Sequence, residues 1–395
     1  MMIELIKQKS LEYFDEVLRL RRHLHQHPEL SFEEFKTQAL VKEQLSAKGI
    51  EVTSIANTGL VALIKGEKSV SEKVIALRGD MDALPITEEN EIDYKSENLG
   101  VMHACGHDVH TSSLLGTAFI LHDLRAHFSG TIKLLFQPGE EKLPGGASIM
   151  IAEGALQNPS PTGIFGQHVY PDLEVGKLGF RSGQYMAACD EIYIEVIGKG
   201  GHGALPHKTI DAVLAASHIV IALQTITSRN RQPDMPSVLS IGKFIANGAT
   251  NILPNSVHLE GTFRSFDEAW RTKAHQLIID VAQNTAKAFG ARAEVEVRKG
   301  YPFVYNDPEL TQLARQCAVD YVGEENVVDL DLRMTGEDFA YYSQEMPGSF
   351  YRLGTRNEAE GIISALHTPT FNVDENSLKL STGFMAYLAL KELEK

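Results

Sequence analysis

The chain has 395 residues, 43% of them hydrophobic, which is more material than a single hydrophobic core usually holds. Its 37 basic and 52 acidic residues give a net charge of −15, which disfavours nucleic acids and anionic membranes as partners. Three cysteines are too few for a disulfide framework and favour reduced thiols. The first residues lack the apolar core of a signal peptide, and no run approaches the ~20 apolar residues of a membrane span, so we expect a cytoplasmic protein.

The N-terminal region predicts two helices followed by a sheet. An amphipathic pattern predicts a helix over residues 3–25. Ser31 followed three residues later by Glu34 is typical of a capping box and predicts a second helix that stops near Gly49. Strands then alternate with helices to about residue 180, which predicts an α/β sheet with helices on both faces.

Two carboxylates follow the apolar strand that begins at Val74. Asp80 and Asp82 are spaced so that both can face the same side of an extended segment. Because metal-ligating histidines usually donate their other ring N–H to a carboxylate, Asp82 is a candidate for orienting such a histidine. A surface turn is the alternative.

One thiol, three imidazoles and a carboxylate occur within the eight residues 103–110, just before an expected helix over 109–124. Thiolate and imidazole are the ligand types that suit zinc and related divalent ions. Cys105 and His107 are too close in sequence to close a four-ligand site alone, so they indicate an open, catalytic metal whose other ligands come from elsewhere. The alternative is a buried cysteine among solvated histidines.

Three later segments supply further candidate ligands. A short buried strand over 131–136 leads into Glu140 and Glu141, at the kind of strand end where α/β sheets place their chemistry. Neighbouring glutamates in a loop point different ways, so one can bind a metal while the other acts as a base. Two short segments carry His168 and His367. A solvated acidic turn and satisfied core histidines are the alternatives for these residues.

The pattern changes from about residue 184. The expected elements are a strand, a glycine turn, a helix over 210–228, strands over 237–244 and 256–265, a helix over 268–289 and a strand over 293–297. This β-α-β-β-α-β order predicts a ferredoxin-like sandwich. The glycine turn satisfies G-x-G-x-x-G, but no helix opens at the glycines and no acidic residue follows ~20 positions on, which disfavours a dinucleotide.

These patterns predict two domains. After Gly300 the chain is expected to return to the first domain, because His367 belongs with the other ligand candidates. We predict a catalytic domain from residues 1–183 and 300–395, interrupted by an inserted domain of residues 184–299.

Taken in order, these segments resemble the M20 metallopeptidase family, and most closely its amidohydrolase branch. That branch holds hippurate hydrolases, auxin-conjugate amidohydrolases and N-acyl amino acid deacylases. The resemblance covers nearly the whole chain, from the segment that begins at Arg21 to His367. Other branches carry His-x-Asp where this chain has Asp80-Met81-Asp82, a departure that favours the amidohydrolase branch over a plain di- or tripeptidase.

The resemblance implies a role for each matching residue. The residues that match the family's ligands for two divalent metal ions are Cys105, His107, Glu141, His168 and His367. Glu140 matches the general base, which would take a proton from water and pass it to the leaving amine. The paired ions would polarise the substrate carbonyl and lower the pKa of the water. Zinc or manganese is expected, and cobalt and nickel are also known in the family.

In the inserted domain, His202 resembles the residue that stabilises the oxyanion. Relatives often supply this histidine from the neighbouring subunit of a dimer, so the resemblance implies a homodimer and a lid that closes on substrate. Arg264 resembles a clamp for the α-carboxylate of the substrate, and Asn251 would help to bind that carboxylate or the scissile amide. An incidental histidine and a surface salt bridge are the alternatives for His202 and Arg264.

We therefore expect a metal-dependent amidohydrolase that cleaves N-acyl amino acids, such as N-acetyl or N-benzoyl derivatives, to a carboxylic acid and a free amino acid. A carboxypeptidase or aminoacylase that acts on short peptides at the same centre is the alternative. A non-catalytic metal-binding scaffold is a third reading, against which the Glu140-Glu141 doublet argues.

Overall fold

The computed structural model describes residues 2–395, which form two compact units. The first unit contains the described residues up to Tyr185 together with Tyr305–Leu332 and Asp338–Lys395. The second contains Met186–Val304 and Arg333–Glu337. Each unit has a hydrophobic core of its own.

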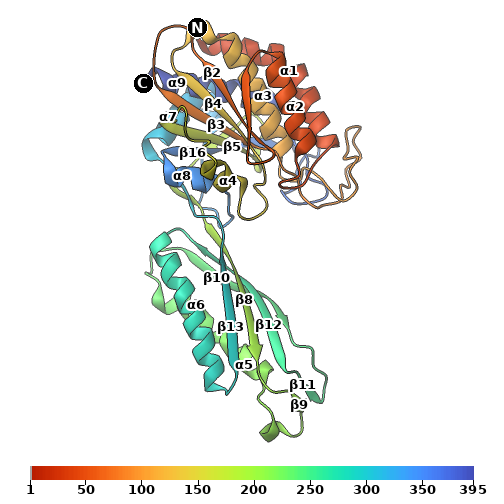
Figure 1. Cartoon of the computed structure of the whole chain (residues 1–395). Helices are drawn as coiled ribbons and strands as arrows, with labels where there is room; N and C mark the ends of the chain where they lie inside the picture. The colour runs from red at the N-terminus through yellow and green to blue at the C-terminus, as the bar shows by residue number, and fades with distance from the viewer. Residues whose placement is uncertain (1) are drawn as a thin grey trace. The chain divides into compact units, whose positions relative to one another are not determined.

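An eight-stranded mixed sheet forms the centre of the first unit, in the order β1-β2-β4-β3-β5-β16-β6-β15 (Figure 1). Its strands are β1 (Glu51–Ile55), β2 (Gly59–Lys65), β3 (Val74–Asp80), β4 (Thr131–Gln137), β5 (Gly163–Glu174), β6 (Leu178–Phe180), β15 (Val327–Asp329) and β16 (Gly348–Arg356). The short strands β7 (Gly183–Met186) and β14 (Val304–Asn306) stand outside this sheet. The neighbours β4, β3, β5 and β16 run parallel. All residues of β3 and β4 are buried, because helices cover both faces, and this explains their continuous apolar sequences.

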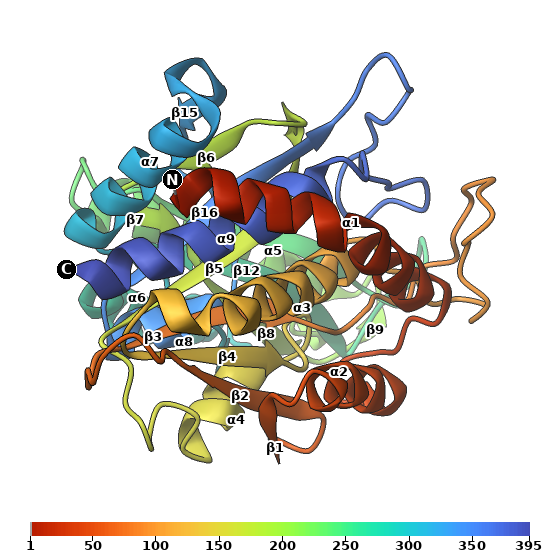
Figure 2. The ribbon, with the colours of Figure 1, turned by 90° about the horizontal axis from the view of Figure 1, so that it is seen from above.

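Helices cover both faces of this sheet, as predicted. On one face, α1 (Met2–Gln26), α3 (His107–Asp123) and α9 (Ser377–Glu394) pack side by side (Figure 2). The other face carries α4 (Gly146–Ala152) and α8 (Phe339–Glu345), which contact each other. The remaining helices of the unit are α2 (Phe35–Ala47), α7 (Pro308–Val322) and the 3-10 turns η1 (Arg125–His127) and η4 (Glu324–Asn326). Residues from His107 to Leu121 of α3 are all buried, so α3 is the central helix of its layer.

The predicted capping box at the start of α2 is wrong. Glu34 makes no side-chain hydrogen bond to the first amides of the helix. The Glu29 carboxylate accepts those hydrogen bonds instead, from the amides of Lys36 (3.1 Å) and Thr37 (2.8 Å). Ser31 and Glu34 are both buried, and their side chains bond to residues around the candidate site.

An antiparallel four-stranded sheet forms the centre of the second unit, in the order β10-β12-β8-β13. Its elements are β8 (Ala188–Ile197), α5 (Ala212–Thr225), β10 (Ser237–Ile245), β12 (Ser256–Ser265), α6 (Glu268–Ala288) and β13 (Arg292–Lys299), which confirms the predicted β-α-β-β-α-β order. Smaller elements are the ribbon of β9 (Gly201–His202) with β11 (Ile252–Leu253), the 3-10 turn η2 (Pro206–Lys208) and the π-helical turn η3 (Ile226–Asn230). Alternate residues of β8 are buried, since one face of its sheet packs on α5 and α6.

The sequence predicts no run long and apolar enough to span a membrane, but the helix from Ala212 to Asn230 meets that description. Within residues 2–395 it is the one helix that is long and apolar enough to cross a membrane. One such helix is weak evidence of a span, because a helix that packs in a core has the same composition. Ile219 and Leu223 lie in the core of the second unit, which accounts for part of its apolar character.

Candidate metal centre

The strand order of the first unit brings the predicted site segments to one edge of the sheet. Asp82 follows the end of β3, the Glu140-Glu141 pair follows β4, and His168 is part of β5. Because these three parallel strands are neighbours, residues at their carboxyl ends meet in space.

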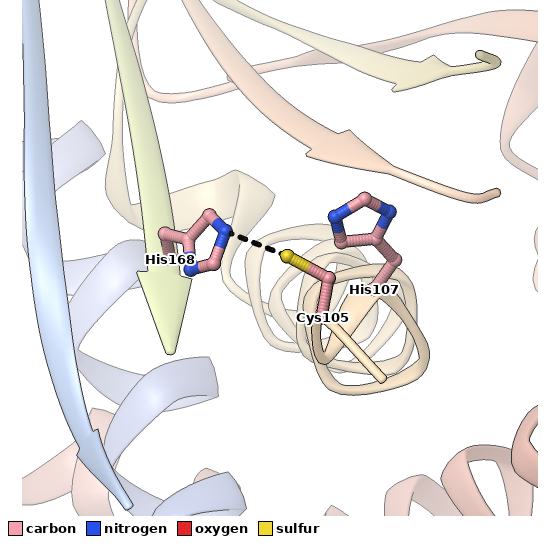
Figure 3. A group of neighbouring side chains, drawn as sticks. All are labelled: Cys105, His107 and His168. Atoms are coloured by element: carbon pink, nitrogen blue, oxygen red, sulfur yellow. Dashed lines mark hydrogen bonds between the residues drawn. The ribbon is translucent and has the colours of Figure 1, made fainter. Parts of the chain in front are cut away.

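Cys105 and His107 stand at the start of α3, on either side of Gly106. Gly106 has a φ of +84°, and a Cβ atom there would lie 2.4 Å from the side chain of Val169. Glycine is required because the left-handed backbone and the close approach both exclude a side chain. The approach puts Cys105 Sγ 3.4 Å from Nε2 of His168, and Figure 3 shows the thiol between the imidazoles of His107 and His168.

Hydrogen bonds orient both imidazoles. His107 donates from Nδ1 to the Asp82 backbone oxygen (2.8 Å) and Oδ1 (3.1 Å), while its Nε2 has no hydrogen-bond partner in residues 2–395. His168 donates from Nδ1 to the Val169 carbonyl at 2.7 Å. In both rings Nε2 is therefore the atom that remains for a metal, and the hydrogen bonds to Asp82 orient the ring of His107.

A second group of possible ligands shares the thiol of Cys105. Its Sγ lies 3.3 Å from Nε2 of His367, which lies 3.1 Å from Oε1 of Glu141. The possible ligands form two sets, and within each set the ligand atoms lie within 4.8 Å of one another. One set comes from Cys105, His107 and His168, and the other from Cys105, Glu141 and His367. A thiolate, imidazoles and a carboxylate are ligand types that would suit divalent ions, and Cys105 belongs to both groups.

His367 reaches this centre from a loop and with an unusual backbone. Its φ is +61°, a left-handed conformation that costs about 1–2 kcal/mol for a residue with a side chain. Its amide donates to the carbonyl of Ala104 at 2.8 Å, which holds it beside Cys105. The His367 side chain is 52% exposed, whereas Cys105 is buried, so His367 marks the side of the centre that solvent reaches.

The two glutamates of the doublet both reach the centre. Glu140 is buried and forms, with His107 and Glu141, a further set of atoms within 4.8 Å of one another. The backbone amide of Glu141 donates to Oδ2 of Asp82 at 3.0 Å. This hydrogen bond joins the loop after β4 to the segment after β3.

Asp80, His107 and His110 also lie close enough to hold an ion, but Asp80 and His110 are engaged within the protein. Asp80 accepts hydrogen bonds from Arg78 Nη1 and His110 Nδ1, each at 2.6 Å. Nε2 of His110 accepts from the amide of Val169 at 2.9 Å. His110 therefore links α3 to β5 as a neutral ring.

Burial and local charges set the protonation of the ligand candidates. Burial lowers the pKa of His107, but Asp80 and Asp82 outweigh it and raise the pKa to about 10. Burial, with Glu141 and Glu140, raises the pKa of the Cys105 thiol well above its usual range. Burial, with Arg352 and His110, lowers the pKa of His168 well below the usual value. Near pH 7 the metal-free centre thus carries protons on Cys105 and His107 and none on Nε2 of His168.

Metal binding should displace those two protons. We expect release of about two protons per chain at pH 7, and weaker metal binding as the pH falls, because a proton and a metal compete for the same atoms. Titration calorimetry in buffers of different ionisation enthalpy measures this number, and Cys105→Ala should lower it by about one. Metal uptake without proton release would contradict a thiolate ligand.

The other predicted site residues lie in the second unit. His202 is exposed on β9, and the amide of the next residue, Gly203, donates to the backbone oxygen of Asn251 at 2.8 Å. Arg264 is partly buried near the end of β12, paired with Cys189 of β8. Within this unit, the structure brings His202 and Asn251 together and leaves Arg264 apart from them.

Two contributors to the centre were not identified from the sequence. His110 has the i, i+3 spacing from His107 that puts both on neighbouring positions of one helix, and this spacing could have indicated it. Ser31 donates to Oδ2 of Asp82 at 2.6 Å, but its sequence context indicates only a helix cap.

A comparison with known families covers the predicted site residues from Asp82 to His367. Residues 76–391 match the family described as Peptidase family M20/M25/M40. The chain is a member of the M20 family. An N-acetyl-L-cysteine deacetylase of Bacillus subtilis is 40% identical over 96% of the chain and 88% of that protein. Thermostable carboxypeptidase 2 of Saccharolobus solfataricus is 38% identical over 99% of the chain and 98% of that protein.

A solved M20 structure has the same fold. It is a Bacillus subtilis protein described as a dinuclear metal binding peptidase, with 34% identity, a TM-score of 0.82, and coverage of 97% of this chain and 99% of that one. The chain is thus an M20 hydrolase, and its grouped ligand candidates support a divalent metal centre.

Proposed function

We propose that this M20 hydrolase is an amidohydrolase that releases a carboxylic acid and a free amino acid from N-acyl amino acids. The observation that carries the proposal is the pair of ligand groups that share Cys105 beside the buried carboxylate of Glu140. The N-acetyl-L-cysteine deacetylase relative supports an N-acetyl amino acid as the first substrate to test.

In this proposal Cys105, His107, Glu141, His168 and His367 hold two ions, with zinc or manganese preferred over cobalt or nickel. When bound, such ions polarise an amide carbonyl and lower the pKa of a water molecule. Glu140 accepts the proton of the attacking water and returns it to the leaving amine. A thiolate ligand needs a reduced cysteine, and all three cysteines are free, which favours the cytoplasm as the compartment.

Removing the base should stop turnover and spare the metal. We expect Glu140→Gln to lower kcat by about 10²–10⁴-fold with little change in KM, because the amide cannot accept the proton. Steady-state kinetics, together with metal analysis of the same preparation, measures both quantities. Turnover within a few-fold of wild type at normal metal content would remove Glu140 from the role of base.

A substrate panel on metal-reconstituted protein tests the reaction itself. Protein stripped by a chelator and resupplied with zinc, manganese, cobalt or nickel should release free amino acid from N-acetyl, N-benzoyl or indole-acyl amino acids. The ion that gives the highest kcat/KM at matched occupancy identifies the preferred metal. Metal-bound protein that hydrolyses none of the panel would instead support a non-catalytic scaffold.

A carboxypeptidase or aminoacylase that acts on short peptides is the second candidate. The thermostable carboxypeptidase relative covers almost the entire chain, and its activity would use the same centre. Dipeptides and N-blocked dipeptides belong in the same panel. Preferential release of a C-terminal amino acid from peptides would favour this second function.

We further propose that residues 184–299 form a lid and the interface of a homodimer. Along β12, the nine residues from Ser256 to Arg264 span about 26 Å, and His202 lies beyond the Ser256 end on the β9–β11 ribbon (Figure 1). This distance exceeds the length of an N-acyl amino acid. One copy of the domain therefore cannot supply both Arg264 and His202 to one substrate, but two copies can.

An apolar edge of the same domain supports pairing with a second copy. β10 is at the edge of its sheet, and Phe244 and Ile245 at its end are exposed. Ile221 of α5 is 67% exposed. Unpaired strand edges and exposed apolar side chains are the surfaces that a symmetric dimer covers.

Complementation between two inactive variants tests whether His202 acts on the partner's substrate. Glu140→Gln and His202→Ala should each be nearly inactive alone. When the two are coexpressed in equal amounts, about one quarter of wild-type activity should return, since half of the dimers are mixed and each has one intact site. No recovery in verified mixed dimers, isolated through two affinity tags, would mean that His202 does not act in trans.

A further inference from the structure

The turn between α1 and α2 directs its polar side chains into the protein. Ser31 and Glu34 are buried, although the capping of α2 is carried out by Glu29. Glu34 is completely inaccessible, and a buried carboxylate is costly unless it is hydrogen-bonded. The groups that donate hydrogen bonds to Glu34 therefore indicate the role of this residue.

Glu34 binds the loop that carries the proposed base. Its Oε1 accepts from the amide of Gly139 at 2.8 Å and from the amide of Phe32 at 2.9 Å. Its Oε2 accepts from the hydroxyl of Thr58 at 2.5 Å. The peptide group between Pro138 and Gly139, one residue before Glu140, is thus fixed to the turn.

Packing at Gly139 adds a second restraint. Gly139 has a φ of +54°, and a Cβ atom there would lie 2.3 Å from the ring of Phe32. Phe32 itself has a left-handed backbone with a φ of +69°. The loop therefore lies directly on the Phe32 ring, in a conformation that only glycine permits.

The peptide group on the other side of Glu140 is fixed to the same turn through Asp82. The amide of Glu141 donates to Oδ2 of Asp82, and the hydroxyl of Ser31 donates to the same oxygen. Residues 31–34 thus restrain the backbone on both sides of Glu140.

We propose that Glu34 is a positioning residue that holds the carboxylate of Glu140 in its catalytic position. The proposal rests on the proposed function, since it assumes that Glu140 is the base. A base works only within hydrogen-bond reach of its proton, and a displacement of about 1 Å can cost 10²-fold in rate. Loss of the Glu34–Gly139 hydrogen bond frees the backbone next to Glu140 but leaves Cys105, His107 and His168 untouched.

Four variants separate positioning from stability. Glu34→Ala should lower kcat by about 10–100-fold, with KM within about threefold of wild type and the metal content unchanged. Glu34→Gln should recover kcat to within about fivefold, because its amide oxygen still accepts from Gly139 and Phe32. Glu33→Gln, at the exposed neighbouring position, is the matched control for charge. Glu29→Gln weakens the cap of α2 and is the control for stability.

A readout independent of substrate accompanies the kinetics. Hydrogen exchange at the amide of Gly139 should be at least about 10-fold faster in Glu34→Ala than in wild type or Glu29→Gln. If wild type hydrolyses none of the panel, the proposed function fails while this exchange still tests the restraint. Should Glu34→Ala not fold, Glu34→Asp replaces it, because the shorter carboxylate keeps the charge but cannot reach Gly139.

Three results would overturn the proposal. The first is a kcat for Glu34→Ala, or Glu34→Asp in its place, within twofold of wild type. The second is an equal loss of kcat in Glu29→Gln at matched thermal stability, which would reduce Glu34 to a general contributor to folding. The third is loss of metal in proportion to kcat, since the effect would then lie in the ligands.

Discussion

The carboxylate of Asp82 is the point on which the candidate centre depends. It accepts hydrogen bonds from the ring of His107, the amide of Glu141 and the hydroxyl of Ser31. These three donors come from the start of α3, the loop after β4 and the turn before α2. A single buried side chain thus sets the relative positions of three segments that are far apart in the sequence. Its hydrogen bonds also keep the pKa of Asp82 low against the effect of burial, so the carboxylate stays charged.

Negative charge gathers on one side of this carboxylate. Glu140, Glu141 and the thiol of Cys105 converge there, while Arg78 is committed to Asp80 and Asp338. Charges of one sign that gather in a buried site are unfavourable. In the metal-free protein, protons retained on Cys105 and His107 relieve part of this excess. Divalent cations would relieve it more completely, so the same electrostatics that makes the metal-free centre unfavourable favours metal binding.

The sequence predicted the fold and the composition of the centre better than the way in which the centre is held. Residues at the ends of neighbouring parallel strands must meet, so the expectation that Glu140, Glu141 and His168 lie near one another needed only the strand pattern. Their catalytic and ligand roles remain predictions. The β-α-β-β-α-β order of the second unit followed from turn residues and apolar periodicity, which are local signals.

Ser31 and Glu34 illustrate what local signals cannot reveal. Their spacing satisfies the capping rule, but the Ser31 hydroxyl bonds to Asp82 and the Glu34 carboxylate to Gly139, and these partners lie 51 and 105 residues away in the sequence. Glu29 is then free to cap α2 from an unusual position. Local sequence signals do not reveal the separation of Arg264 from His202 either, since this separation depends on which end of the sheet each residue occupies.

The packing of α9 against both α1 and α3 bears on how the protein is made. This helix is synthesised after all of the ligand candidates, yet it packs in the layer that supports Cys105 and His107. His367 comes almost as late. During synthesis the early part of the chain therefore exposes Cys105, His107 and Glu141 without the packing that holds them in place. The full set of ligand candidates exists only after His367 and α9 have been synthesised, and a nascent chain that captures an ion earlier would do so with an incomplete and less selective set of ligands.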